Sequence, residues 1–515
     1  MRDRKDYTGV IRRAFLALGL KPAPSVFTRG RRVAIANDAG WDVLWGLHWS
    51  NLVLPTETPA AGGRVAPSLR EFRRRGPGLR RSQILNMVPG IVWETLCTKD
   101  ALQKSYERTL GRLTSARVGL SLVDAVGVLG FLLPSFRLPE QRREWVSSGA
   151  HVSAGEADLW MLKPLNAAEG RGIRLIERPR AGDQVPAATL YPGGETLVAQ
   201  QYVANPLTFR GHKFDLRVWA LLTSVTPLRV YLLPDAYVRV ASTVKFDPGP
   251  QYINNRCMHV TNGALQRKCR ESRGRAGAGV VLPHPHGIWD PRFGAGLQPC
   301  ELCNAEQGVQ YDVPTLWQRV KRAVVKTLLM VLPELREFGN RGRKLDFLPR
   351  CFQFLSFDVL FDAAAQPFVI EVNADGYMKG GLQKVRHPEW GDGFQFTKAM
   401  LELVGVRGYD RSGYQRHFEE LVASFCANPR RRHLGDGETV RVKCTPGEMD
   451  VLQTHEDEWH HRGGWERIWP PHEWISGFSE GSWRHHFFPF LDNGGAEADD
   501  EVLWDWLAWR AMYAS

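Results

Sequence analysis

Three charged residues alternate with apolar ones in the segment KFDLRVWALL, which begins at Lys213. Lys213, Asp215 and Arg217 are two residues apart, so in a strand their side chains share one face and the apolar residues between them occupy the other. The stretch that follows, 218–222, is entirely apolar. Two cations flanking a carboxylate on such a strand predict that it lines a pocket for an anionic ligand.

A second polar set is predicted on a β-hairpin formed by FQFLSFDVLFD and PFVIEVNA. Glu371 and Asn373 share one strand face, and Asp358 lies on the strand that we pair with it. Two carboxylates and an amide oxygen are hard ligands suited to Mg²⁺, which keeps positions for phosphate and water. Because carboxylates in apolar strands are costly to bury without a cation, we predict a magnesium site here. The alternative is an edge-strand acid beside a turn-forming Asn.

Lys163 ends the apolar segment DLWMLKP, and Gly170 and Gly172 follow in the next turn. Glycine lets the backbone approach a phosphate chain, and the lysine supplies the opposite charge. The chain contains no GxxxxGK[ST] P-loop. By itself the pattern is weak, since glycine-bearing hairpin tips and strand-end lysines are common.

Arg239, in AYVRV, adds a further cation that we group with Lys213 and Arg217. Arginine binds phosphate and carboxylate in a bidentate manner, so the three residues are candidates to hold a transferred phosphate or a substrate carboxylate. An internal salt-bridge cluster around Asp215 is the alternative.

The segments that position these residues have the patterns of short strands and amphipathic helices. Helices are predicted from Thr98, as N-cap, towards Leu110, and over Val313 to Leu332 and Phe396 to Val404, with a further helical stretch to Ala427. Strands are predicted from Asp158, Gly172, Thr196, Lys213, Pro227, Ala236, Phe352 and Pro367, with turns at Asn205-Pro206, Gly211 and Pro234-Asp235. The Gly-, Arg- and Pro-rich stretch 265–308 is predicted to be a surface insertion.

Composition and charge fit an enzyme with an acidic partner. A chain of 515 residues should divide into two or three domains. The net charge of +12 favours association with polyanions, although charge alone does not choose among nucleic acid, anionic lipid and an acidic protein tail. The N-terminus lacks a signal-peptide pattern and no run reaches the length of a membrane span, so we expect an intracellular, soluble protein.

The cysteines and one histidine-rich segment are expected to have no role in the chemistry. The eight cysteines are scattered, which predicts free thiols, and Cys300 with Cys303 forms a lone CxxC that is typical of an incidental loop feature. HEDEWHH, from His455, lacks the HExxH spacing of a zinc site and is predicted to lie at the surface.

Taken together, these segments resemble the tubulin-tyrosine-ligase-like family of the ATP-grasp superfamily. The family's Trp-x-x-Lys-Pro segment and following Gly-x-Gly-Ile are similar to WMLKP at Trp160 and GRGI at Gly170. Later blocks resemble VAQQYVANPL, KFDLRVW, YVRVAS, HVTN, FDVLFD and FVIEVNA, in the family's order and approximate spacing. MVPGIVWETLCTKDAL and LLPSFRLP resemble upstream segments, so the similarity spans roughly 85–405.

The resemblance implies an α+β fold: an ATP-grasp core of antiparallel and mixed sheets flanked by helices, with an N-terminal α/β subdomain and a divergent C-terminal extension. We expect an N-terminal extension with a basic loop over 1–84 and a first part of the ligase module over 85–155. The catalytic core would span 156–405, and a helical, Trp-rich extension would span 406–515.

The resemblance also implies ATP and Mg²⁺ as cofactors and assigns the site residues. Asp358, Glu371 and Asn373 would hold Mg²⁺, and Lys213, Arg217 and Arg239 would act in catalysis. Positions that would surround ATP and line its phosphate and amino-acid side are Lys99, Lys163, Gly170, Gly172, Gln200, Tyr202, Val203, Lys213, Asp215, Thr261 and Asn262. Because a carboxylate is a poor acyl donor, γ-phosphoryl transfer would first make an acylphosphate, which an amine then attacks.

The implied activity is the attachment of an amino acid, with glutamate favoured, to acidic C-terminal tails of tubulin. The arginine runs at Arg70 to Arg81 and Arg430 to Arg432 would favour docking on such a tail or on the microtubule surface, unless they are solvated loops. We expect no membrane and no nucleic-acid partner, and a cytoplasmic, cytoskeletal location, with the cilium or basal body as a narrower possibility. Tyrosine or glycine as the added residue remains an alternative.

One departure from the family pattern follows the metal strand, where Asn-x-Ser-Pro is replaced by Asn373-Ala374-Asp375-Gly376. The extra carboxylate puts the choice of amino acid and acceptor in doubt. Two rival hypotheses are a catalytically inactive microtubule-binding homologue and a nucleic-acid-binding protein. The retained Lys163, Asp358, Glu371 and Asn373 argue against the first, and the lack of an ordered recognition motif argues against the second.

Overall fold

The computed structural model describes most of the chain from residue 95 onward and short pieces before it. The described residues are 13–14, 17–18, 33–34, 43–44, 52–53, 84–85, 95–148, 158–165, 170–179, 183, 194–241, 244–275, 287–299, 311–340, 351–374, 382, 385–406, 408–427, 444–470, 490 and 498–513.

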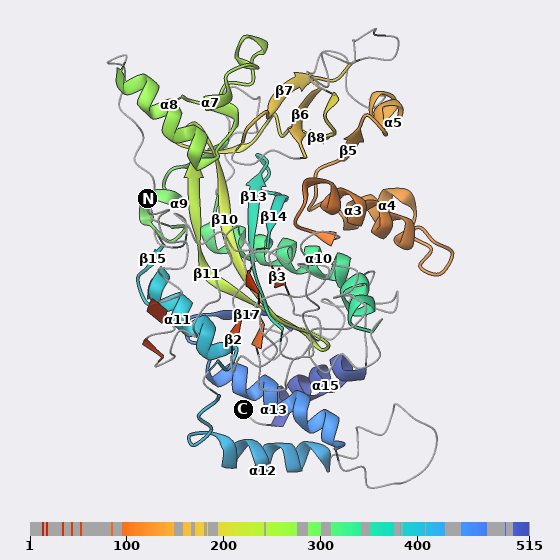
Figure 1. Ribbon diagram of the computed structural model, residues 1–515, viewed down its shortest axis with the longest axis vertical. Coiled ribbons are helices and arrows are strands. Elements are labelled where there is room, and N and C mark those ends of the chain that lie inside the picture. The colour runs from red at the N-terminus through yellow and green to blue at the C-terminus, as the bar shows by residue number, and fades with distance from the viewer. Residues whose placement is uncertain are drawn as a thin grey trace, which may run out of the picture.

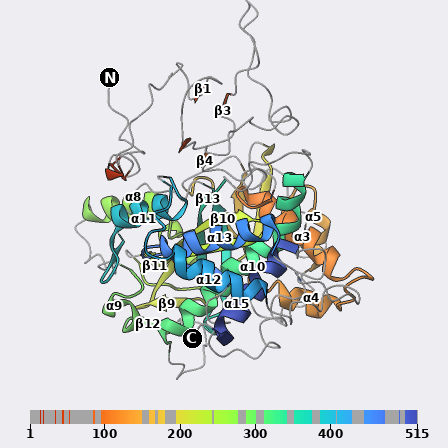
Figure 2. The ribbon, with the colours of Figure 1, turned by 90° about the horizontal axis from the view of Figure 1, so that it is seen from below.

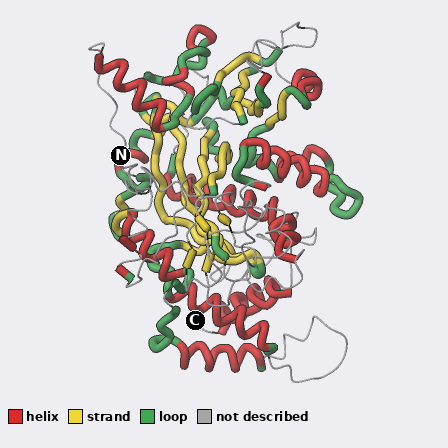
Figure 3. Tube along the Cα trace, viewed as in Figure 1, coloured by secondary structure: helices red, strands yellow, loops and turns green. Residues whose placement is uncertain are grey.

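Runs of strands and runs of helices follow one another along the described chain, and the two larger sheets are antiparallel, which makes this an α+β protein (Figures 1 and 3). The helices are α3 (Lys99–Leu113), α4 (Leu122–Val128), α5 (Arg142–Ser147), α7 (Arg256–His259), α8 (Gly263–Arg275), α9 (Pro291–Gly294), α10 (Val313–Asn340), α11 (Gly393–Leu403), α12 (Gln415–Cys426), α13 (Pro446–His460) and α15 (Ala498–Tyr513), with the 3₁₀ turn η5 (Pro250–Tyr252). The strands are β1 (Val33–Ala34), β2 (Val43–Leu44), β3 (Leu52–Val53), β4 (Ile84–Leu85), β5 (Ser135–Leu138), β6 (Leu159–Pro164), β7 (Arg174–Glu177), β8 (Leu197–Gln201), β9 (Leu207–Phe209), β10 (His212–Val225), β11 (Leu228–Val240), β12 (Leu297–Pro299), β13 (Gln353–Phe361), β14 (Pro367–Asn373), β15 (Arg386–His387), β16 (Gly391–Asp392) and β17 (Glu466–Trp469).

An antiparallel sheet built around β10 forms the centre of the molecule (Figure 1). One edge of β10 pairs with β11, which continues to β17, and the other edge pairs with β9 and β13. β14 extends the sheet beyond β13, so the predicted hairpin of these two strands is confirmed. Arg210 and Gly211, both at positive φ, form the tight turn between β9 and β10.

The two faces of β10 are covered differently, as its alternating sequence predicts. Phe214, Leu216 and Val218 are buried in a large core together with apolar residues of α10. Lys213, Asp215 and Arg217 point to the other face, where they line a cavity. Further along that same face, Trp219 and Leu221 pack with apolar residues of α11. On this face, α11 therefore covers the C-terminal part of β10, and the charged N-terminal part of the strand borders the cavity.

Our prediction of a turn at Pro234-Asp235 is wrong, because β11 continues through both residues. The register slips here: Ala236 pairs with Val218, whereas Leu232 pairs with Ala220. Proline cannot donate to a sheet ladder, and a β-bulge is one of the few places where a strand accommodates it. The Asp235 carboxylate is buried and accepts hydrogen bonds from the backbone N–H groups of Ala236 and Ile288.

A smaller antiparallel sheet, in the order β5-β8-β6-β7, lies above the large one in Figure 1. Trp160, Leu162 and Ala199 face away from the large sheet and pack with Trp145 of α5. Lys163 and Gln200 have the opposite strand parity and line the cavity. The predicted strand pair around the glycine turn is confirmed, since β6 pairs with β7.

The stretch 265–308 is not simply a surface insertion, as we had predicted. Its first part belongs to α8, which lines the cavity, and β12 pairs with β9 at the edge of the large sheet. β12 and α9, which is capped by Asp290, are only three and four residues long. Elements this short show no hydrophobic periodicity from which the sequence could predict them. Residues 276–286 and 300–310, with Cys300 and Cys303, lie outside the described residues.

Three helices of the C-terminal region, α12, α13 and α15, cross the lower end of the molecule (Figure 2). Phe418, Phe425, Leu452 and Trp506 form their shared core. The predicted helical stretch to Ala427 is present as α12, which begins only at Gln415.

The first four residues of HEDEWHH, 455–458, are buried within α13, which contradicts the predicted surface position for this part of the segment. His455 and the three acids 456–458 are each at most 3% exposed. Glu458 receives a bidentate contact from Arg229, at 2.9 and 3.1 Å, together with hydroxyl groups of Tyr231 and Thr223. Partners that come from distant segments allow these charges to be buried, and no local sequence pattern reveals them.

The prediction of free thiols is also wrong for two pairs of cysteines. Cys257 is bonded to Cys269, and Cys426 is bonded to Cys444. The first bond joins α7 to α8, and the second joins α12 to the residue before the N-cap of α13. The thiol of Cys351 is buried, and burial raises its pKa.

Of the first 85 residues the structure describes only short pieces, in which β1 pairs with β3 and β2 pairs with β4, both in parallel. Both predicted arginine runs and residues 375–376 lie outside the described residues. Within the described part, no helix combines the length and apolar character that crossing a bilayer requires.

Candidate active site

A cavity of about 890 Å³ lies between the two sheets. The small sheet contributes β6 and β8 to its described lining, and the large sheet contributes β10, β11, β13 and β14. The first part of α3, the end of α7 and most of α8 complete it. The lining contains nine Lys and Arg residues and four Asp and Glu residues. This excess of positive charge suits an anionic ligand.

Two arginines and two aspartates form a connected ion-pair cluster on the floor of the cavity. Arg217 pairs in a bidentate manner with Asp358, with both contacts at 2.8 Å. Arg239 pairs in the same way with Asp215 and also reaches Asp358 at 2.9 Å. Burial opposes ionisation of Asp358, but the charges of Arg217 and Arg239 outweigh it and lower its pKa to about 2. The salt-bridge cluster that we gave as an alternative is therefore present, and it lies within the cavity lining.

Lys213 is 4% exposed and lies over the ring of Tyr202, with Nζ 3.7 Å from the ring centroid. Burial lowers the pKa of Lys213 to about 7, although Asp215 opposes the shift. A group with this pKa changes charge readily when an anion enters.

Lys163 and Lys99 extend the positive lining towards the small sheet and α3. Lys163 donates to the Gln200 side chain at 2.6 Å, and burial lowers the pKa of its amine. Lys99 begins α3, directly after its N-cap Thr98, and burial lowers the pKa of Lys99 as well. Three lysines with lowered pKa values thus face one cavity, as expected for a site that is completed by an anionic ligand.

His259 fixes Tyr202 and was not among our predicted site residues. Its Nδ1 accepts from the Tyr202 hydroxyl at 2.8 Å, while Nε2 faces the Tyr252 carbonyl at 2.9 Å. Burial, reinforced by Lys213, lowers the pKa of His259 to about 4, so the imidazole is neutral at pH 7. His259 is the first residue of the HVTN motif that the sequence analysis singled out. Its role could not be recognised from the sequence, because it depends on the contact with Tyr202, which lies in a distant segment.

Thr261 and Asn262 connect the cavity floor to α8. The Thr261 hydroxyl donates to Asp215. The Asn262 side chain accepts from the backbone N–H groups of Ala264 and Leu265, so it caps the first turn of α8.

The predicted magnesium ligands lie side by side on β13 and β14. Asp358 is directly opposite Glu371 in the strand register, and Asn373 follows two residues later on the same face. Asp358 is buried, whereas Glu371 is exposed and Asn373 is half-buried. Within the described part of the chain no group of three or more His, Cys, Asp or Glu residues is placed to hold a metal. A cation here would therefore need oxygen atoms from a bound ligand or water as well.

The two predicted glycines differ in position. Gly170 lines the cavity, and its carbonyl accepts a hydrogen bond from Arg256. Gly172 is outside the lining, at φ +70°, with Pro164 so close that a Cβ would lie 2.8 Å from it. Its role is to complete the turn.

The cavity lining thus brings together nearly all of the predicted site residues, with Gly172 as the exception. The residues in the lining are Lys99, Lys163, Gly170, Gln200, Tyr202, Val203, Lys213, Asp215, Arg217, Arg239, Thr261, Asn262, Asp358, Glu371 and Asn373. Sequence reasoning missed His259, Arg171 and the polar residues of α8, which fall in a segment without strand or helix periodicity.

Comparison with known proteins gives a match to the family model described as "Tubulin-tyrosine ligase family" over residues 79–280 and 298–382. The matched residues include every position of the cavity lining named above.

Several curated relatives align over most of this chain. A human protein named tubulin polyglutamylase TTLL13 is 25% identical over 457 residues, which cover 86% of this chain and 47% of the relative. A human protein named tubulin monoglutamylase TTLL4 is 25% identical and covers 76% of this chain and 32% of its own length. A Danio rerio protein named tubulin polyglutamylase ttll6 is 24% identical, with 76% and 44% covered. The chain therefore spans less than half the length of these relatives.

Proposed function

Because the chain belongs to the tubulin-tyrosine ligase family, we propose that it is an ATP-dependent ligase that attaches glutamate by an amide bond to the acidic C-terminal tail of tubulin. The observation that carries this proposal is the convergence of lysines, arginines and the Asp358–Glu371–Asn373 set in one cavity. The names of the relatives support tubulin as the acceptor and glutamate as the added residue. Its place of action would be the microtubule cytoskeleton.

We assign the two antiparallel sheets and the cavity between them to an ATP-grasp core. Lys163 and Gln200 of the small sheet and Lys213 of the large sheet would contact ATP. Tyr202 and Val203 add apolar surface for the base. The cavity volume lies near the upper end of the roughly 300–1,000 Å³ typical of small-ligand sites, which suits a nucleotide that shares its site with a second substrate.

The donor set fits a magnesium ion that also binds phosphate. Glu371 and Asn373 present oxygen atoms on one face. Oδ1 of Asp358 accepts from Arg217 and keeps a second lone pair, whereas Oδ2 is shared by Arg217 and Arg239. Mg²⁺ usually takes one or two protein carboxylates and completes its shell with phosphate and water, so this small set is sufficient. When bound, the ion would supply positive charge against the nucleotide phosphates.

The proposed reaction divides into two balanced steps. The acceptor carboxylate attacks the γ-phosphorus of ATP, and ADP leaves. The amine of the amino acid then attacks the resulting acylphosphate, and inorganic phosphate and a proton leave as the amide forms. Lys163 and Lys213 neutralise phosphate charge in the first step, and Lys213 must be protonated to do so. Arg217 and Arg239 line the same cavity, and a guanidinium group has five N–H donors, so these two residues would stabilise the oxyanion of the second step.

The test is incubation of the purified chain with ATP, Mg²⁺, tubulin and one labelled amino acid at a time. Nucleotide-dependent incorporation of glutamate supports the proposal, and incorporation of only tyrosine or glycine would reassign the added residue. Lys163→Met should abolish incorporation, whereas Arg416→Gln, on the exposed face of α12, is the matched control. ATP binding without incorporation of any amino acid would favour an inactive homologue and overturn the proposal.

A further inference from the structure

The cations of the cavity fall into an inner and an outer group. The inner group, Lys99, Lys163, Lys213, Arg217 and Arg239, is buried or half-buried and lies among Asp215, Asp358 and Glu371. The outer group consists of Arg171, after Gly170, and Arg267, Lys268 and Arg270 of α8, with one acid, Glu271. Of these, Arg171, Arg267, Lys268 and Glu271 are exposed and Arg270 is half-buried.

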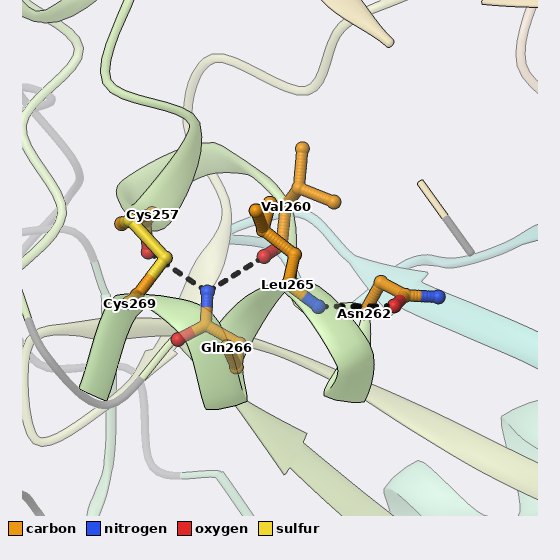
Figure 4. The surroundings of a disulfide bond; sticks show 6 residues. All are labelled: Cys257, Val260, Asn262, Leu265, Gln266 and Cys269. Carbon is orange, nitrogen blue, oxygen red and sulfur yellow. Dashed lines mark hydrogen bonds between the residues drawn. A yellow bond between two sulfur atoms is a disulfide. The ribbon is translucent and has the colours of Figure 1, made fainter. Parts of the chain in front are cut away.

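The chain holds α8 in place by three separate attachments (Figure 4). Cys269 of α8 is bonded to Cys257 of α7. Gln266, 1% exposed, donates to the backbone carbonyls of Cys257 at 2.9 Å and Val260 at 2.7 Å. Asn262 caps the first turn. The backbone of α8 that carries the outer cations is therefore held in a fixed position relative to the cavity, which lowers the entropy cost of using these side chains in recognition.

The glycine turn of the cavity lining is tied to the same unit. Arg256 of α7 donates to the Gly170 carbonyl, so the turn that carries Arg171 is anchored to the helix pair. A ligand that passes the entrance meets cations from two elements that are linked to each other.

Resting on the proposed function, we propose that this outer group, Arg171 with Arg267, Lys268 and Arg270, is the docking surface for the Glu-rich acceptor peptide. A bound nucleotide would occupy the inner cations and leave the outer ones facing a second anion. Arginine pairs well with carboxylate, and Arg267 and Arg270 are one helical turn apart, a rise of about 4.5 Å. Neighbouring same-side carboxylates of an extended chain are separated by about 6.5–7 Å, so flexible arginine side chains can pair with successive ones.

The chemistry of α8 favours a peptide over a nucleic acid. Single-stranded nucleic acids are held by cations together with aromatic rings on which bases stack. The sequence of α8, GALQRKCRESRGR, has no aromatic residue, and it places an acid, Glu271, among its cations.

The decisive experiment measures binding of a fluorescein-labelled octaglutamate peptide to the full chain by fluorescence anisotropy, in the presence of Mg²⁺ and a non-hydrolysable ATP analogue. The triple variant Arg267→Gln, Lys268→Gln, Arg270→Gln should raise the peptide Kd at least tenfold. Arg171→Gln, on the other element, should raise it several-fold. The charge-matched control Arg117→Gln, Arg143→Gln, Arg416→Gln changes three exposed residues outside the lining and should alter the Kd less than twofold. Affinity for the ATP analogue should stay within twofold in all variants, which also reports that they are folded.

Three results would overturn this inference. The first is no binding of octaglutamate to the unmodified chain, and the second is an equal loss of octaglutamate affinity in the control and α8 variants. The third is that a single-stranded oligonucleotide of equal charge binds more tightly than octaglutamate and that the α8 variant abolishes this binding. An octaglutamine peptide should not bind. If octaglutamate binds through α8 but no amino acid is incorporated into tubulin, the proposed ligase activity fails and the docking surface stands. If incorporation proceeds at an unchanged peptide KM in the α8 variant, the docking surface fails and the ligase stands.

Discussion

Arg217 and Asp358 lie directly opposite each other on adjacent strands, β10 and β13, and their side chains form a bidentate ion pair inside the cavity. The pair connects β10, which carries Lys213 and Arg217, to the β13–β14 hairpin, which carries the proposed magnesium ligands. Through Arg239, which contacts both Asp358 and Asp215, it becomes one cluster of four charged residues. The ion-pair cluster that stabilises the fold is therefore also part of the candidate active site. Mutation of single residues can separate what each contributes to stability from what it contributes to activity.

Asp358→Asn should destabilise the fold as well as remove activity. The substitution leaves the buried Arg239 and the half-buried Arg217 with one carboxylate in their cluster, that of Asp215, and breaking a buried pair typically costs about 3–5 kcal/mol. We expect a clearly lower midpoint of urea unfolding. An unfolding midpoint equal to that of the unmodified chain would show that the arginines do not depend on this carboxylate.

Glu371→Gln should remove activity without loss of stability. Glu371 is exposed, so replacing its charge removes no buried pair, but it removes a proposed magnesium ligand. Ligase turnover should fall by at least about 100-fold while the unfolding midpoint stays the same. Raising the Mg²⁺ concentration should restore part of the rate, and a variant with full turnover at limiting Mg²⁺ would exclude Glu371 from the ion's shell.

Nucleotide binding should be coupled to proton uptake at Lys213. With a pKa of about 7 in the free protein, Lys213 is mostly neutral at pH 8 and charged at pH 6, and bound phosphates favour the charged form. Binding at pH 8 should therefore take up close to one proton more than binding at pH 6, and affinity should fall as pH rises above 7. Calorimetry in buffers of different ionisation enthalpy measures this uptake.

Lys213→Arg is the control for the proton-uptake prediction, because arginine keeps its charge throughout this pH range. The variant should bind nucleotide with about one proton less taken up at pH 8. Equal uptake in the variant and the unmodified chain would place the titrating group elsewhere.

Loss of the Cys257–Cys269 bond should weaken binding of the acidic peptide several-fold. The bond joins α7, next to His259, to the helix that carries the outer cations. Cys257→Ser with Cys269→Ser should raise the octaglutamate Kd while leaving ATP-analogue affinity nearly unchanged. Cys426→Ser with Cys444→Ser removes the bond between α12 and the start of α13, away from the cavity lining, and provides the matched comparison. Similar effects from both double variants would indicate a general loss of stability.

Glu458→Gln should be strongly destabilising although the residue lies outside the cavity lining. Glu458 is the carboxylate partner of Arg229 and also accepts from the hydroxyl groups of Tyr231 and Thr223. Leaving a buried arginine without its charge partner should cost about 3–5 kcal/mol in the free energy of unfolding. The same substitution at exposed Glu420 should change it by less than about 0.5 kcal/mol. A small effect at Glu458 would mean that Arg229 finds another partner.

Much of the local structure follows from short-range patterns in the sequence. Thr98 caps α3 as predicted, the apolar periodicity from Val313 continues into the long helix α10, and the alternation from Lys213 places charges on one face of β10. The pairing of Asp358 with the strand that carries Glu371 also follows from the pattern, because a short connection between two apolar strands predicts a hairpin. These features depend on residues within a few positions of one another.

The sequence by itself thus determined which residues share a face and which face is polar. Only the tertiary structure decided that β11 passes through Pro234 at a bulge and that α8 borders the cavity. It also decided that Glu458 and His455 are buried against Arg229 and Arg467, and that Cys257 reaches Cys269. Each of these depends on a partner that another segment supplies. Whether a charged side chain or an irregular strand can be buried depends on the free energy that such a partner supplies. The hydrophobic periodicity of one segment holds no information about a partner in another segment.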